Sequence, residues 1–314
     1  MLAAGRTAAG HAPPPQPLRD VSLGVHGPAG LEQFFLPLLQ SCPGIEWLYM
    51  TEGFQGLLAG DAHAAFQSMH SLKSLHIVMQ CPSKGEYTRS DFHTLPAVLT
   101  HLTGLTKFYV HCAITAQHAS HAGPGQGQLS DAIACLTGLQ HLEINVPVDA
   151  AAQRAPLFSC LRKLTKMVVR SKCRFKSTPT MPALHGDGLL GASHLQSLQW
   201  LGVDIERGRV WDQSCVAKSF AAALPSLKQL RCLVLCPEMC AISLEDHLRP
   251  LAHTLTRLHI RTRSYLSAKR STRRSEHQWY ADCAALLGTV GVLTSLHHMD
   301  VVIFLLMAPA WLPG

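Results

Sequence analysis

Histidine and cysteine are the residues of this chain best suited to chemistry, since 314 residues include 19 His and 11 Cys. Imidazole and thiolate groups bind zinc and similar ions when three or four of them converge. The closely spaced sets are Cys232, Cys236 and Cys240; His111, His118 and His121; and His297 with His298. None of these sets has the paired Cys-x-x-Cys spacing of a zinc site. The sequence therefore predicts no metal site.

The familiar sequence signatures of catalysis are missing as well. The chain contains no GxSxG elbow, no P-loop, no HExxH motif and no GxGxxG after a strand. We therefore expect no enzymatic activity, no catalytic residue and no cofactor. The odd number of scattered cysteines favours reduced thiols in the cytoplasm, with the nucleus as the alternative compartment.

A six-residue pattern recurs nine times, with apolar residues at its first, fourth and sixth positions. Residues 105–110 (LTKFYV) and 139–144 (LQHLEI) are clear copies. The copies end at residues 50, 77, 110, 144, 169, 203, 235, 260 and 301, so the intervals are uneven. One short element repeated in this way is typical of a solenoid, in which each coil presents the same element to its neighbours.

The end of each hexamer alternates apolar, variable, apolar, which predicts a half-buried strand. Before one hexamer, Leu95, Val98, Leu99 and Leu102 have the spacing of a helix face. A glycine such as Gly104 follows, where a helix end favours a left-handed residue. Each unit is thus predicted to be helix, turn and strand, and right-handed crossovers would make the strands parallel.

Residues 102–110 (LTGLTKFYV) and 136–144 (LTGLQHLEI) resemble leucine-rich repeats. The resemblance covers about residues 31–304 and is closest to irregular plant and algal arrays, although no F-box is visible. It implies an α/β solenoid of about nine irregular repeats, with a curved parallel sheet on the concave side and helices on the convex side. The family's Asn or Cys after the strand is absent from all nine copies, so no regular side-chain ladder is expected.

Three segments follow from this organisation. Residues 1–30 are predicted to be a disordered lead rich in Ala, Gly and Pro, residues 31–304 the repeat domain, and residues 305–314 an apolar tail. The lead has no apolar core of a secretory signal, and a transit peptide is not expected. No apolar run reaches the roughly 18 residues of a membrane span.

The third and fifth hexamer positions should face away from the core, onto the concave sheet. Many of them are aromatic, His or cationic residues, which are typical of interfaces. The predicted partner-binding residues are Trp47, Tyr49, His76, Lys107, Tyr109, His141, Lys166, Trp200, Arg257 and His259. The alternative is that loops or the N-terminal segment cover these side chains.

These observations predict a non-catalytic scaffold for protein–protein interaction, which could recognise substrates within a larger assembly. A formal charge of +7 favours an acidic partner. The alternative is nucleic-acid binding through basic clusters at 154–176 and 257–274, although such clusters are also common on solvated surfaces. No membrane partner is expected, and the oligomeric state is left open.

Overall fold

The structure is a computed structural model. It describes residues 18–23, 37, 39–50, 66–79, 95–112, 131–145, 159–171, 194–205, 222–235, 248–265, 290–291 and 293–306.

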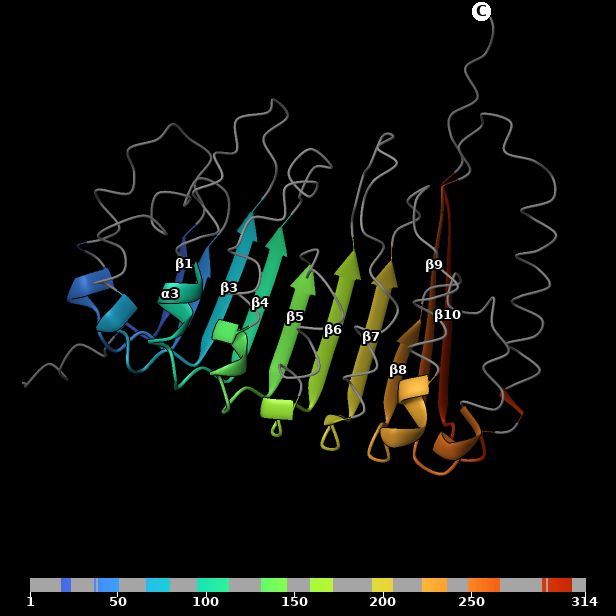
Figure 1. The fold of residues 1–314 in the computed structure, drawn as a ribbon. Helices are drawn as coiled ribbons and strands as arrows, with labels where there is room; N and C mark the ends of the chain where they lie inside the picture. Colours follow the sequence, from blue (N-terminus) through green and yellow to red (C-terminus); the bar gives the residue numbers. More distant parts are fainter. Residues whose placement is uncertain are drawn as a thin grey trace, which may run out of the picture.

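In this described part of the chain, ten strands form one parallel sheet in strict sequence order (Figure 1). Nine of them begin at the third position of a hexamer. The predicted leucine-rich-repeat solenoid is therefore confirmed as a fold. The strands are β1 (Asp20–Leu23), β2 (Trp47–Met50), β3 (Ser74–Met79), β4 (Lys107–Cys112), β5 (His141–Asn145), β6 (Lys166–Ser171), β7 (Trp200–Ile205), β8 (Cys232–Leu235), β9 (Arg257–Tyr265) and β10 (His298–Leu306).

Strand β1 lies inside the segment that the sequence assigned to a disordered lead. Its four residues pair in register with β2, from Asp20 beside Trp47 to Leu23 beside Met50. Residues 18–23 (LRDVSL) have the same apolar spacing as the nine hexamers. The array therefore contains a tenth copy of the pattern, which sequence reasoning overlooked.

The helical segments behind the sheet are shorter than the sequence suggested. Those with defined bounds are α3 (Leu95–Leu99), η4 (Leu224–Ser226) and η6 (Arg249–Leu251). Helix α3 buries Leu95, Val98 and Leu99, as their spacing predicted. In the described residues, the back of the array is therefore made of single turns rather than of long helices.

A tight turn precedes each hexamer. The N–H of the first hexamer residue donates to a carbonyl three or four residues earlier, as from Leu105 to Leu102 and from Leu139 to Leu136, both at 2.9 Å. Neither Gly104 nor Gly138 has a left-handed φ angle. The expectation of left-handed helix ends at these glycines is therefore wrong, because the turn bonds connect residues of ordinary conformation.

The core lies between the sheet and these turns. It consists of the first, fourth and sixth hexamer residues together with the apolar residue that opens the turn. Leu142 in β5 and Leu258 in β9 are fourth-position residues, with 1% and 0% of their surface exposed. The predicted alternation therefore holds both in the middle of the sheet and near its C-terminal end.

The coils are joined by main-chain hydrogen bonds where the strands begin. The second-position carbonyl of one coil accepts N–H bonds from the second and third positions of the next. Lys73 O, for example, accepts from Thr106 N at 2.8 Å and Lys107 N at 2.9 Å, and the same pair recurs at all nine junctions. The Thr106 hydroxyl also donates to the Lys73 carbonyl, at 3.0 Å. A regular ladder therefore exists, although it is made by the backbone and not by Asn side chains.

Candidate partner-binding face

The strand register aligns the third and fifth hexamer positions into two rows that cross the sheet. We call the surface formed by these rows the outer face, since it is turned away from the core. Every predicted binding residue lies in one of them. The third-position row includes Trp47, Lys107, His141, Lys166, Trp200 and Arg257, and the fifth-position row includes Tyr49, His76, Tyr109 and His259.

The first group on the outer face is an aromatic cluster over β2 to β4, formed by Trp47, Tyr49, His76, Tyr109 and His111. The Trp47 and Tyr49 rings stack with centroids 5.9 Å apart and planes 7° apart. Tyr49 meets His76 edge-on at 4.6 Å. His76 then contacts the rings of Tyr109 at 5.2 Å and His111 at 5.4 Å. Five rings from three strands therefore form one continuous surface.

The aromatic cluster ends at an ion-pair contact. His111 Nε2 lies 3.0 Å from Glu143 Oε1, and their side chains are only 17% and 10% exposed. Sequence reasoning left His111 and Glu143 out of the binding set. The position of His111 was predictable from the sequence. The alternation of buried and outward-facing side chains in β4 continues past Val110, the last hexamer residue, and so places His111 on the outer face.

Tyr109 lies between the rings and this carboxylate. Burial raises the pKa of the Tyr109 phenol, and the negative charge of Glu143 raises it further. The hydroxyl therefore stays protonated at neutral pH. It can donate a hydrogen bond while its ring contributes apolar surface, as aromatic anchors in interfaces do.

The second group is cationic and lies over β4 to β6. His141 is the register neighbour of both Lys107 and Lys166. Burial lowers the pKa of the His141 imidazole, and the positive charges of the two lysines lower it further. The imidazole is therefore neutral at pH 7, between two cations.

Trp200 in β7 extends this cationic group toward the C-terminal end of the sheet. Its ring lies over Gly202, since a Cβ atom at Gly202 would come within 2.8 Å of two Trp200 ring carbons. Lys166 Nζ lies 4.7 Å from the Trp200 ring centroid, which is a cation–π distance. The absence of a side chain at position 202 thus lets the indole lie flat across the outer face.

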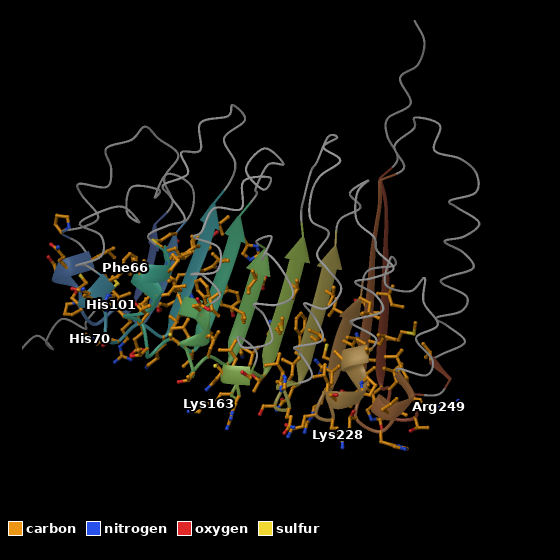
Figure 2. The ribbon with its side chains drawn as sticks, viewed as in Figure 1. Phe66, His70, His101, Lys163, Lys228 and Arg249 are labelled. Atoms are coloured by element: carbon orange, nitrogen blue, oxygen red, sulfur yellow. The ribbon has the colours of Figure 1, made fainter. Side chains whose placement is uncertain are left out.

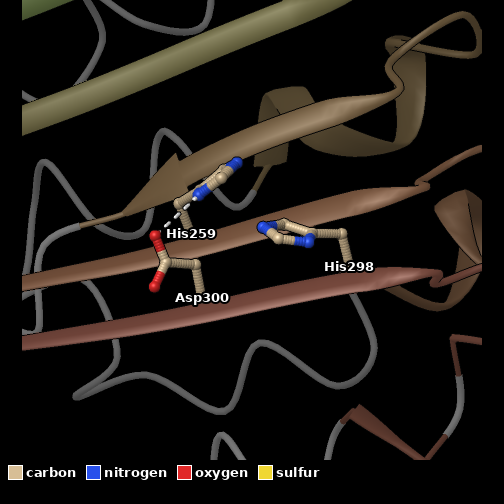
Figure 3. Close-up of side chains that lie close together, drawn as sticks. All are labelled: His259, His298 and Asp300. Atoms are coloured by element: carbon tan, nitrogen blue, oxygen red, sulfur yellow. Dashed lines mark hydrogen bonds and ion pairs between the residues drawn. The ribbon is translucent and has the colours of Figure 1, made fainter.

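The third group lies over β9 and β10, at the other end of the sheet. His259 Nδ1 is 3.5 Å from Asp300 Oδ2, and the rings of His259 and His298 are 5.4 Å apart (Figure 3). The sequence analysis selected Arg257 and His259 here but not His298 or Asp300. The predicted residues therefore fall into three groups, of which the first two meet on β4, where Lys107 and Tyr109 are two residues apart.

The basic clusters do not form one surface in the described residues. In the cluster at 154–176, Lys166 belongs to the outer face. Lys163 lies instead in the turn before β6, and Figure 2 shows it with Lys228 and Arg249 along the edge where the strands begin. Much of both clusters lies outside the described residues.

The fold and the outer face together define a solenoid of leucine-rich-repeat type. No protein-family model matches the chain, and no curated protein matches it either. Among solved structures, the leucine-rich-repeat-containing protein LegL7 from Legionella pneumophila is similar, with a TM-score of 0.43 and 12% identity. The match covers 92% of this chain and 84% of LegL7. At that level of similarity, the fold assignment depends on the strand order and the repeat ladder.

The described helices include none with the length and apolar character needed to cross a membrane.

Proposed function

We propose that the chain is a non-catalytic scaffold that binds a protein partner on its outer face. The observation that carries this proposal is the continuous ring surface from Trp47 to His111. Stacked rings lose little conformational entropy on binding and offer both apolar surface and polar edges. Such rings next to cations resemble the anchors that dominate protein interfaces.

The charges of the third-position row favour a partner with acidic character. From β2 to β10 this row contains Lys107, Lys166 and Arg257 but no Asp or Glu. The acidic side chains of the fifth-position row, Glu143 and Asp300, each face a histidine. Apart from Asp20 in β1, the third-position charges that an approaching segment meets are therefore positive, which attracts carboxylates and speeds their association.

A reducing compartment suits this proposal. Cys42, Cys135, Cys160 and Cys232 are free thiols. Reduced thiols are usual in the cytoplasm and nucleus. Of these two compartments we favour the cytoplasm. There the scaffold could recognise substrates as part of a larger assembly.

Affinity capture with matched variants tests the proposal. The bait is the full chain, as wild type, as Lys107→Ala/Tyr109→Ala, and as Lys163→Ala. Lys163→Ala removes the same unit of charge from the edge and leaves the outer face intact. We expect the wild type and Lys163→Ala to retain the same protein, and the double variant to lose it. Circular dichroism should show that all three baits are folded.

The affinity of the captured protein is then measured with each variant. Equal dissociation constants for the double variant and Lys163→Ala would contradict binding on the outer face. Retention of nucleic acid instead, with an affinity that falls steeply as salt rises, would support the basic clusters as the functional surface.

A further inference from the structure

Three metal-ligand side chains meet on the outer face at the C-terminal end of the sheet. His259 is the fifth-position residue of β9, and Asp300 is its register partner in β10. His298 lies two residues before Asp300 on β10, and so on the same side of that strand. Figure 3 shows the two imidazoles and the carboxylate close together.

The distances allow these groups to share one ion. One potential ligand atom from each residue lies within 4.8 Å of the other two. Ligands at about 2.0–2.1 Å from a tetrahedral ion are about 3.3 Å apart. The 3.5 Å between His259 Nδ1 and Asp300 Oδ2 already matches that spacing. His298 offers its ligand atom within 4.8 Å of both, so it has to approach more closely to share the ion.

We propose that His259, His298 and Asp300 form a binding site for a divalent first-row transition ion, with Zn²⁺ as the best fit. Imidazole and carboxylate are common zinc ligands. Three protein ligands leave one coordination position, which faces the solvent side of the sheet. Water, or a carboxylate of a bound partner, can occupy it. The site does not depend on the proposed partner binding.

The pair of His259 and Asp300 is poorly explained as a simple hydrogen bond. A charge-assisted N–H···O bond is usually 2.7–2.9 Å long, which is well below the observed 3.5 Å. Asp300 is 44% exposed, so its contact with His259 contributes little in water. A metal ion between His259 and Asp300 could be coordinated by both side chains at the distance that already separates them.

One neighbouring residue, Arg257, limits the affinity of the site. Arg257 is the register partner of His298, so a positive charge lies one strand away from the site. Its side chain is exposed, and solvent therefore screens that charge. His111 and Glu143 contact each other at 3.0 Å over β4 and β5, but among the described residues only the C-terminal group brings three potential ligands together.

Metal titration of the full chain tests this proposal, with Zn²⁺ alone as the probe after treatment with a chelator. The variants are His298→Ala and Asp300→Asn, and the control is His297→Ala. Residue 297 is an exposed histidine next to the site, at the second hexamer position rather than on the outer face. Because other His and Cys side chains of the chain are also potential zinc ligands, the stoichiometries are compared between variants.

We expect the wild type and His297→Ala to bind one more equivalent of Zn²⁺ than His298→Ala. Asp300→Asn should weaken this equivalent at least about tenfold, since even a residue beyond the direct ligands weakens metal binding by that factor. In a Co²⁺ titration, the difference spectrum between wild type and His298→Ala should show d–d bands without thiolate charge transfer. Equal stoichiometry and affinity in the wild type and His298→Ala would overturn the proposal, and so would an equal loss in His297→Ala.

Discussion

Two contacts on the outer face each pair a histidine with a carboxylate. One joins His111 to Glu143, and the other joins His259 to Asp300. They differ in the distance between the two side chains and in how much of each side chain is exposed to solvent. The first is 3.0 Å long, with side-chain exposures of 17% and 10%. The second is 3.5 Å long, with exposures of 20% and 44%. The ring of His76, on the neighbouring strand β3, contacts His111 in the first, whereas the imidazole of His298 accompanies His259 in the other.

The two contacts lie on strand pairs that share the parallel register and the hydrogen-bond ladder where their strands begin. They differ in the side chains around them. Over β4 and β5, the His111 ring lies against the aromatic cluster, and the contact with Glu143 is mostly buried. At the C-terminal end, the histidine and carboxylate remain accessible to a further ligand. One backbone thus supports a ring surface at one end and a candidate ion site at the other.

The largest expected effect tests whether the core is equally well packed beneath the two contacts. Leu142→Ala in β5 and Leu258→Ala in β9 each remove a buried fourth-position side chain. Each should lower the free energy of unfolding by about 2–5 kcal/mol, because a cavity is left behind. Denaturant titration followed by circular dichroism measures this loss. If one variant loses less than about 1 kcal/mol, the cores beneath the two contacts are not equivalent.

The next effect separates the shielded contact from the exposed one. Glu143→Gln should cost about 1–3 kcal/mol, since it leaves a mostly buried imidazole without its charged partner. Asp300→Asn should change stability by less than about 0.5 kcal/mol when measured with chelator present. The same denaturant titration compares the two. Equal costs would show that the shielding of Glu143 has no energetic consequence.

A smaller effect concerns the region between the two ends. Lys166→Gln removes the charge above the Trp200 ring and should cost about 0.5–1 kcal/mol. Lys107→Gln is the matched control, because Lys107 is exposed in the same row. Its substitution should change stability by less than about 0.5 kcal/mol. If Lys107→Gln lowers the free energy of unfolding as much as Lys166→Gln does, the loss is due to the change in net charge and not to the contact with the Trp200 ring.

The smallest effect is a pH dependence from His141. Burial and the two neighbouring lysines lower its folded-state pKa below the usual imidazole value of about 6.5, so the unfolded chain binds more protons below that pH. The stability contributed by the neutral imidazole is complete above 6.5 and is lost as the pH falls toward the lowered pKa. Denaturant titrations at about pH 7.5 and pH 5.5 should show a smaller difference for His141→Gln than for the wild type. An unchanged difference would assign the dependence to other groups.

The strands and the core could be predicted because hexamer spacing alone decides which residues face inward. The same spacing was visible at residues 18–23, so β1 was predictable in principle. In the described residues, the helical segments are shorter than predicted for a physical reason. Leu99, Leu102 and Leu105 are spaced by three, and successive turns of three residues satisfy that spacing as well as a helix does.

The contacts on the outer face were only partly predictable. Register follows from aligning the hexamers, so the rows of neighbours could be written from the sequence. The side-chain rotamers could not. Whether the Trp200 indole lies over Gly202, or how closely His259 approaches Asp300, depends on packing across several strands. The sequence therefore indicated a binding face without separating its three groups.

The ladder of carbonyls at the second hexamer position uses only atoms that every residue type other than proline supplies. Side chains at that position include Arg19, Glu46, Gln140 and Thr256, with no loss of the hydrogen bonds. Coil junctions are thus chemically interchangeable along the array. If unequal recombination adds or removes a repeat in the gene, the new neighbouring coils can therefore form the same main-chain hydrogen bonds. The number of repeats and the side chains on the surface can then evolve separately.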